Sequence, residues 1–200
     1  MAHDFTVQST TERFHGRVMD VVSDEVLMPG GRVATRDYVR HPGAVAVLAL
    51  DESDRVLMIW QYRHPVRRRL WELPAGLRDV ADERPELAAV RELAEEGYVR
   101  AAMWHTLADT YSSPGMCNEG IRTYLARGLS PVPDAERYQP DDDEEVDMER
   151  HWVPLEQAVA MVLRGEVTNG PCQVGLLAAA RSQVDRWASL RAPDLPWFAN

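Results

Sequence analysis

The stretch that most constrains the fold is the apolar run AVAVLAL at residues 44–50, which lies between the turn-forming sequences HPG and DESD. A short apolar run bounded by turn signals is typical of a buried strand at the centre of a sheet. The next segment, residues 55–62, is rich in β-forming side chains, and the polar turn before it predicts a hairpin with the apolar run. We therefore expect a sheet built around residues 44–50.

The first part of the chain has a different pattern. Residues 1–12 are polar and are expected to be loose. Two β-rich runs then flank a Pro-Gly-Gly turn at residues 29–31, which predicts antiparallel strands between residues 14 and 39. Such a small sheet is only marginally stable alone. We expect residues 1–42 to form a β-strand appendage and residues 43–200 to form the main domain.

Helical periodicity appears later in the chain. Between residues 83 and 96, Leu87, Val90 and Ala94 predict the apolar stripe of a helix, and Pro85 falls in its first turn, where proline is tolerated. Two further strands are expected near residues 103–112 and 120–128, before an acidic loop. Residues 155–163 and 174–190 predict two closing helices.

Charge and cysteine content narrow the possible functions. The formal net charge of −10 makes nucleic acid a poor partner, because such binding depends on phosphate neutralisation by basic side chains. An anionic substrate remains possible if a metal ion or local arginines reverse the field. Two cysteines make no disulfide framework, and neither a signal peptide nor a membrane-spanning run is evident, so we expect a cytoplasmic protein without a membrane partner.

The segment RELAEEGY at residues 91–98 concentrates charge on one helix face. Glu92, Glu95 and Glu96 are spaced i, i+3 and i+4, so their carboxylates lie together and repel one another. A solvated charged face would explain such a cluster by itself. A hard divalent cation such as Mg²⁺ would also remove the repulsion, since it prefers oxygen ligands.

Three neighbouring features favour the metal site. Arg91 can hold one of the carboxylates in a bidentate pair. A strand ending in LPAG precedes the helix, so the backbone carbonyl of Ala75 can point at the same metal. The order Gly76, Glu83, Arg91-Glu92 and Glu95-Glu96 is a long composite pattern, which is more specific than any acidic pair.

Residues 76–99 resemble the box of the Nudix hydrolase family, G-x5-E-x7-R-E-U-x-E-E-x-G-U, in which U is aliphatic. Two departures are visible. Six residues separate Gly76 from Glu83 instead of five, and Gly97 comes one position before the family's glycine, whose place is taken by Tyr98. We expect Gly97 to end the helix in a left-handed conformation. The departures leave the arginine and the three helix carboxylates in place.

The resemblance extends to the ADP-ribose pyrophosphatase branch of the family and covers most of the chain. The segment QYRHPVRRRLWELPAGL, the SPGMCNE loop at residues 113–119 and the EEVDM run at residues 144–148 are similar to that branch. It implies an α/β (α+β) fold, a Nudix α/β/α sandwich with a mixed sheet and a small N-terminal antiparallel β-domain. In relatives this β-domain packs across a homodimer and contacts substrate.

The resemblance also implies the reaction and its metal. Water attacks the diphosphate of a nucleoside diphosphate linked to a group X, and Mg²⁺, or Mn²⁺, is the cofactor. The metal ligands would be Glu92, Glu95, Glu96 and the carbonyl of Ala75, with Glu96 bridging metals. Glu83 and Arg91 would orient these carboxylates.

Further roles follow from the same resemblance. The late acidic loop supplies the general base, which places Glu144 in that role and leaves Glu145 as the alternative. Arg63 aligns with a substrate-binding arginine, and Glu72 and Glu119 match positions that contact the ribose side or the metal site. The basic loop at residues 67–69 is either a phosphate contact or a solvated segment.

ADP-ribose, cleaved to AMP and ribose 5-phosphate, is the leading substrate. The alternatives are another nucleoside diphosphate sugar, a CDP-alcohol or a dinucleotide. A protein of another class, a non-catalytic ADP-ribose sensor, usually lacks box carboxylates and carries a DNA-binding module. The intact carboxylates and the strand-rich N-terminus argue against that class.

Overall fold

The structure is a computed structural model that describes residues 4–139 and 144–198, with only the backbone described for Glu144 and Glu145. The chain divides into two compact units. The first contains the chain up to Gly43 together with Tyr111–Gly120, and the second contains Ala44–Thr110 and the chain from Ile121 onward. The segment 111–120, which the sequence analysis placed in the second domain, thus groups with the first unit.

The first unit contains an antiparallel sheet in the order β1-β2-β3, formed by β1 (Val7–His15), β2 (Asp20–Leu27) and β3 (Val33–Arg40). The expectation that residues 1–12 are loose is wrong for residues 7–12, which belong to β1 and pair with β2 through two register shifts. Every residue of β1 is exposed, so it lacks the apolar alternation that marks a half-buried strand. Polar contacts hold it instead, including Thr10 Oγ1 to Asp24 Oδ1 at 2.6 Å.

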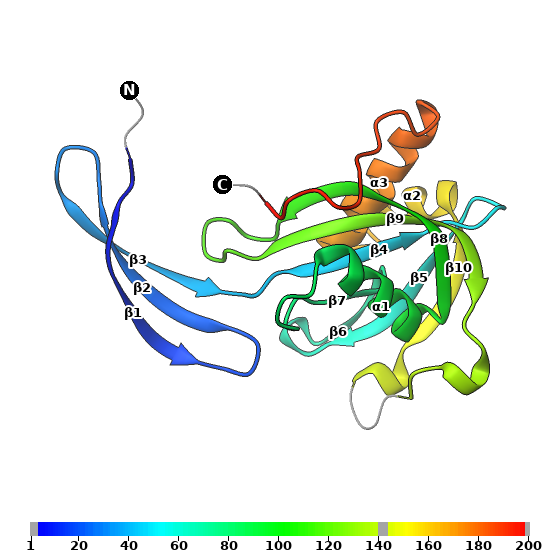
Figure 1. The fold of residues 1–200 in the computed structure, drawn as a ribbon, viewed down its shortest axis with the longest axis horizontal. Coiled ribbons are helices and arrows are strands. Elements are labelled where there is room, and N and C mark those ends of the chain that lie inside the picture. The colour runs from blue at the N-terminus through cyan, green and yellow to red at the C-terminus, as the bar shows by residue number, and fades with distance from the viewer. Residues whose placement is uncertain (1–3, 140–143, 199–200) are drawn as a thin grey trace. The chain divides into compact units, whose positions relative to one another are not determined.

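The core of the second unit is built on the apolar run, which forms β4 (Ala44–Ala49). Alternate residues of β4 enter two different hydrophobic clusters, Val45, Val47 and Ala49 in one and Ala46 and Leu48 in the other. The first cluster includes residues of helix α1 (Pro85–Gly97), and the second includes residues of α2 (Leu155–Leu163) and α3 (Gly170–Val184). Helices therefore cover both faces of β4, as Figure 1 shows.

Two sheets pack in this unit. One has the order β7-β4-β9-β8, in which β4 is parallel to β9 and antiparallel to β7, and the other has the order β10-β5-β6. Their strands are β5 (Arg55–Arg63), β6 (Arg68–Glu72), β7 (Ala75–Leu77), β8 (Val99–Tyr111), β9 (Gly120–Pro131) and β10 (Glu149–Pro154). Short 3-10 turns occur at His64–Val66, Asp134–Glu136 and Glu144–Asp147 (η3).

The expected hairpin between residues 44–50 and 55–62 is wrong. Both hydrogen-bonding edges of β4 are taken, by β7 on one side and by β9 on the other. Just beyond β4, an isolated bridge between Leu50 and Val56 and a bond from the Asp51 N–H to the Arg55 carbonyl close the turn, but β5 pairs along its length with β6 and β10 instead. The polar turn itself forms, because the Asp51 carboxylate accepts the N–H groups of Ser53 and Arg55.

Helix α1 buries a face that the periodicity did not predict. Leu87 and Val90 are exposed, so the expected stripe is wrong. The buried residues of the helix are Ala88, Ala89, Glu92, Leu93, Glu96 and Gly97. Small alanines allow the helix to approach the sheet closely, and the two glutamates are carried into the packed face.

The closing helices were predicted with mixed accuracy. Helix α2 has the predicted bounds, whereas α3 starts four residues earlier than expected, at Gly170. Asn169 caps α3 by accepting the N–H of Cys172 at 2.9 Å, and a proline lies in the first turn, both common at helix starts. In the described part of the chain, no helix is long and apolar enough to cross a membrane.

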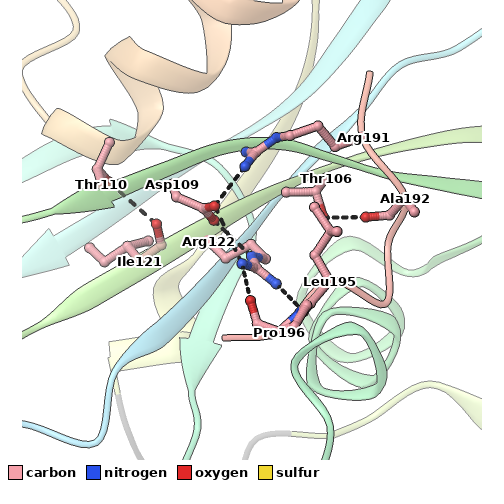
Figure 2. A network of polar contacts seen from close by, with 9 residues as sticks. All are labelled: Thr106, Asp109, Thr110, Ile121, Arg122, Arg191, Ala192, Leu195 and Pro196. Carbon is pink, nitrogen blue, oxygen red and sulfur yellow. Dashed lines mark hydrogen bonds and ion pairs between the residues drawn. The ribbon is translucent and has the colours of Figure 1, made fainter. Parts of the chain in front are cut away.

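A buried arginine fastens the C-terminal segment to strands β8 and β9 (Figure 2). Arg122 is only 2% exposed and donates to Asp109, to the carbonyl of Leu195 at 2.7 Å and to the carbonyl of Pro196 at 2.9 Å. Arg191 donates to the same aspartate at 2.9 Å. Burial alone would raise the pKa of Asp109, but hydrogen bonds from the two arginines more than offset it and hold the pKa below 3.8.

We predict that Asp109→Asn destabilises the protein in a pH-dependent way. A carboxyl group whose pKa is lower in the folded state stabilises the fold above its unfolded pKa, and this stabilisation is lost as the pH falls through the folded pKa. The free energy of unfolding, measured with urea, should therefore be lower for Asp109→Asn than for the wild-type protein at pH 7. This difference should shrink below pH 3.8. Glu166→Gln, which removes an exposed pair with Arg164, serves as the control and should cause little change. A deficit of constant size across this pH range contradicts the prediction.

Candidate active site

Arg91 contacts three of the carboxylates in the candidate site. It lies on α1, and its guanidinium donates to both oxygens of Glu83, at 3.2 Å and 3.0 Å. A second group of contacts joins its Nη1 to Glu92 and, at 3.3 Å, to Glu95. Hydrogen bonding to Glu83, followed by the charge of Glu92, raises the pKa of Arg91 above its ordinary value, so the cation is permanent.

The Glu92 carboxylate lies directly against the backbone of β7. A Cβ atom added to Gly76 would lie 2.0 Å from Cδ of Glu92 and 2.1 Å from its Oε1. No side chain larger than hydrogen fits between the strand and this carboxylate. A larger residue at position 76 would therefore force the Glu92 carboxylate out of its observed place against the strand.

Glu96 is held by the residue before that glycine. Its Oε2 accepts the backbone N–H of Ala75 at 2.7 Å. Glu92 and Glu96 are 8% and 6% exposed, which is unusual for charged groups unless they are paired or bind a metal. Strand β7 is in turn paired with β4 through Ala75 and Ala46. The central strand therefore supports the β7 backbone that contacts both carboxylates.

The donor set suits a hard divalent cation. The carboxylates of Glu83, Glu92 and Glu95 contact the guanidinium of Arg91, and Glu96 adds a fourth carboxylate beside β7, so the carboxylates outnumber this cation. Oxygen donors with a negative excess are the ligands that Mg²⁺ and Mn²⁺ prefer. The structure brings Ala75 beside Glu96 through its N–H, and the role of its carbonyl remains a prediction.

A second acidic cluster lies in the first unit. Among the described residues, potential ligand atoms of Glu12, His15 and Asp20 lie within 4.8 Å of one another, a closeness that the α1 carboxylates do not reach. On α1, Arg91 draws Glu92 and Glu95 to itself while Ala75 holds Glu96. In the first unit, Arg40 already pairs with Glu12 at 3.1 Å and with Asp20 at 2.7 Å.

The end of α1 differs from the expected geometry. Gly97 is the last residue of the helix, and Tyr98 takes the left-handed conformation with φ 55° and ψ 28°. The prediction that Gly97 adopts this conformation is therefore wrong. Packing explains the glycine, because a Cβ at residue 97 would lie 2.9 Å from Leu57 Cδ2 and 3.0 Å from Leu93 Cδ1.

The structure joins two of the predicted substrate-binding residues to each other. Arg63 donates to both carboxylate oxygens of Glu72, at 3.1 Å from Nε to Oε1 and 2.7 Å from Nη2 to Oε2. Glu72 is buried and Arg63 is partly exposed, so the pair presents its positive end to solvent. The expected basic loop at residues 67–69 is mostly strand, since β6 starts at Arg68, and Arg69 on this strand binds both the carboxylate and the backbone carbonyl of Asp147.

Glu119 belongs to the first unit, where its Oε1 lies 3.6 Å from Nδ1 of His41. The loop before it joins β3, since Val39 N–H donates to the Met116 carbonyl at 2.8 Å. A cavity of about 390 Å³ lies in this unit between β3 and the loop. Whether Glu119 contacts substrate stays a prediction.

The predicted base falls in η3. The backbone of Glu144 and Glu145 forms the start of this turn, but their side chains lie outside the described residues. The sequence analysis missed Arg150, which follows η3 and binds the end of α1. The displaced glycine at residue 97 was the signal that this helix end is unusual.

Comparisons with known proteins agree with this geometry. The family model described as NUDIX domain matches residues 39–171. The chain is 43% identical to an ADP-ribose pyrophosphatase of Mycobacterium tuberculosis, over 98% of this chain and 92% of that protein. It is 38% identical to an ADP-ribose pyrophosphatase of Bacillus subtilis, over 77% of this chain and 80% of that protein.

A solved structure, described as an ADP compounds hydrolase, superposes with a TM-score of 0.76 at 18% identity. It covers 94% of this chain and 98% of its own, and at this identity the likeness concerns the fold alone. The chain belongs to the Nudix family, and the expected mixed α and β fold with an N-terminal antiparallel sheet is confirmed. Its class is that of a Nudix pyrophosphohydrolase.

We predict that Gly76→Ala weakens divalent cation binding about tenfold to hundredfold, because the added methyl group displaces the Glu92 carboxylate. Mn²⁺ titration followed by electron paramagnetic resonance measures the affinity. Gly170→Ala is the matched control, since a Cβ there meets nothing within 4 Å. Equal Mn²⁺ affinity in Gly76→Ala and the wild-type protein means that this contact does not shape the metal site.

Proposed function

We propose that the protein is a Mg²⁺-dependent pyrophosphohydrolase that cleaves ADP-ribose into AMP and ribose 5-phosphate. The observation that carries the proposal is the contact of the Glu92 and Glu96 carboxylates with the backbone of β7, together with the pairing of Arg91 and Glu92. The similarity to ADP-ribose pyrophosphatases along nearly the whole chain supports this choice of substrate.

The residues of α1 and β7 have separate tasks in this proposal. The chemistry supplied by Mg²⁺, or Mn²⁺, when held by Glu92, Glu95, Glu96 and the Ala75 carbonyl, is neutralisation of the diphosphate charge. Glu83 and Arg91 keep the ligand carboxylates in orientation, since Arg91 bonds to each of Glu83, Glu92 and Glu95. The Ala75 N–H fixes one oxygen of Glu96 and so limits its rotation.

The bond changes follow from hydrolysis of an anhydride. The oxygen of water forms a new bond to one phosphorus, and the bond from that phosphorus to the bridging oxygen breaks. The departing phosphate keeps the bridging oxygen and its electron pair. We assign removal of the proton from the attacking water to Glu144, with Glu145 as the alternative, because the carboxylates of α1 are committed as ligands.

Substrate contacts are proposed for the paired residues of β5 and β6. Glu72 is buried and orients the guanidinium of Arg63, and a planar guanidinium suits recognition of phosphate oxygens. We propose that Arg63 contacts a phosphate and that Glu119 contacts the ribose side. The sensor alternative is disfavoured, since its usual loss of box carboxylates is not seen in this chain.

We predict that the protein releases AMP from ADP-ribose in millimolar Mg²⁺ and that EDTA abolishes the reaction. The measurement is a panel of ADP-ribose, nucleotide sugars, CDP-alcohols and dinucleotides with chromatographic identification of products. Faster turnover of another panel member moves the substrate assignment within the family. Absence of turnover on every compound contradicts the proposed activity.

The base assignment leads to a second prediction. Glu144→Gln should lower kcat about 100-fold or more, the usual contribution of general base catalysis, while Glu145→Gln should lower it far less. Glu149→Gln, an exposed carboxylate at the start of β10, is the control and should remain active. The reverse order of the two glutamate variants moves the base to Glu145.

We further propose that the N-terminal strands pair the protein into a homodimer. The sheet exposes several large apolar side chains, among them Val7, Phe14 and Val33, which a partner could cover. Sedimentation velocity should show a dimer for the wild-type protein, and Phe14→Glu should shift it towards monomer. A wild-type protein that sediments as a monomer at micromolar concentration contradicts the proposal.

A further inference from the structure

The end of the carboxylate helix carries an unusual backbone. Tyr98 has φ 55°, in the left-handed region that side chains other than glycine and asparagine rarely adopt. Such a conformation is unfavourable for an ordinary residue, because its Cβ comes too close to the following carbonyl oxygen. This is the position at which the family pattern places glycine, so surrounding contacts must stabilise the tyrosine.

Two arginines supply those contacts. The guanidinium carbon of Arg150 lies 3.9 Å from the centroid of the Tyr98 ring, and that of Arg137 lies 5.0 Å from it. A guanidinium cation over an aromatic face is attracted by the negative charge density of the ring. The Tyr98 carbonyl is also bound, since it accepts the N–H of Val132 at 2.9 Å.

Arg150 does more than stack. Its Nε donates to the backbone carbonyl of Glu96, one of the last carbonyls of α1, where the helix dipole favours a positive charge. Its Nη1 lies 3.4 Å from the carbonyl of Met148, the residue that follows η3. One planar group therefore joins the end of the carboxylate helix, the ring of Tyr98 and the backbone beyond η3.

The same backbone is held from a second direction. Arg69, on β6, donates to the carbonyl of Asp147 at 3.1 Å and pairs with its carboxylate. Arg150 itself is anchored in β10, where it is the register partner of Ile59 on β5. The backbone that follows η3 is thus held by two arginines from β6 and β10, the strands on either side of β5.

We propose that Arg150 is a positioning residue for hydrolysis, which sets the backbone of η3 against the carboxylates of α1 and uses Tyr98 as its platform. The proposal rests on the proposed function, in which η3 supplies the base. Among the described residues, the hydrogen bonds and ring contact of the Arg150 side chain go to the backbone of Glu96 and Met148 and to the Tyr98 ring, so it acts through these groups.

Substitutions of the two residues separate positioning from simple stabilisation. Arg150→Gln removes both the planar set of guanidinium donors and the cation that stacks on Tyr98. It should lower kcat about tenfold to hundredfold with little change in KM. Arg150→Lys keeps the charge without the planar fork and should recover only part of the rate. Tyr98→Phe keeps the ring and should resemble wild type, whereas Tyr98→Asn tolerates the left-handed backbone, loses the ring and should fall between them.

Three readouts are measured for each variant: kcat and KM for ADP-ribose, the pH profile of kcat, and amide hydrogen exchange of residues 144–149. In Arg150→Gln the low-pH limb of the kcat profile, which reports the general base, should shift. Amide hydrogen exchange in residues 144–149 should accelerate. Arg100→Gln is the control, because Arg100 forms an exposed pair with Glu136 in the second unit and contacts neither the helix end nor η3 in any recorded hydrogen bond or ion pair. It should match wild type in all three.

The outcomes are distinguishable. A lower melting temperature with unchanged kcat, pH profile and exchange well below that temperature makes Arg150 a structural cap and overturns the proposal. Faster exchange with unchanged kcat also overturns it. If the wild-type protein hydrolyses nothing in the substrate panel, the proposed function fails, and the exchange measurement alone decides whether Arg150 holds η3.

Discussion

The contact between the Glu92 carboxylate and the backbone of Gly76 is the constraint on which the rest of the site depends. It requires a glycine on β7, a helix close enough to press a charged group against a strand, and a cation to offset the burial of charge. Arg91 meets part of that last requirement. The negative charge that Arg91 leaves uncompensated is the feature on which the proposed divalent cation site rests.

Arginine serves the same purpose at several places in this acidic chain. All 22 basic residues are arginine, and no lysine occurs. Arg91 gathers the site carboxylates, Arg122 binds the C-terminal segment through two carbonyls, and Arg150 binds the end of α1. A planar group with several fixed donors can bind carboxylates and carbonyls at once, which an ammonium group on a flexible stem does less well. The hydrogen bonds of Arg91 and Arg150 thus hold the carboxylates and the end of α1 in place.

The sequence predicted the parts of the site that depend on local spacing. The proximity of Arg91, Glu92 and Glu95 follows from their helical spacing, whereas the expected strand ending at Gly76 divides into β6 and β7, with Gly76 inside β7. The exposed edge strand β1 could not be predicted, because polar contacts rather than an apolar pattern hold it. Nor could the pairing of β4, whose edges are taken by strands distant in sequence. Tyr98 and Arg150 meet only in the folded chain, so spacing showed that the helix end was unusual and not how it is stabilised.

The central claim is that the carboxylates of α1 that lie beside β7 bind the catalytic metal. A crystal structure of the protein soaked with Mn²⁺, with anomalous scattering used to locate the ion, tests it most directly. The account predicts an anomalous peak bonded to carboxylate oxygens of Glu92, Glu95 and Glu96 beside Ala75. A peak only at Glu12, His15 and Asp20, with none along α1, would contradict it.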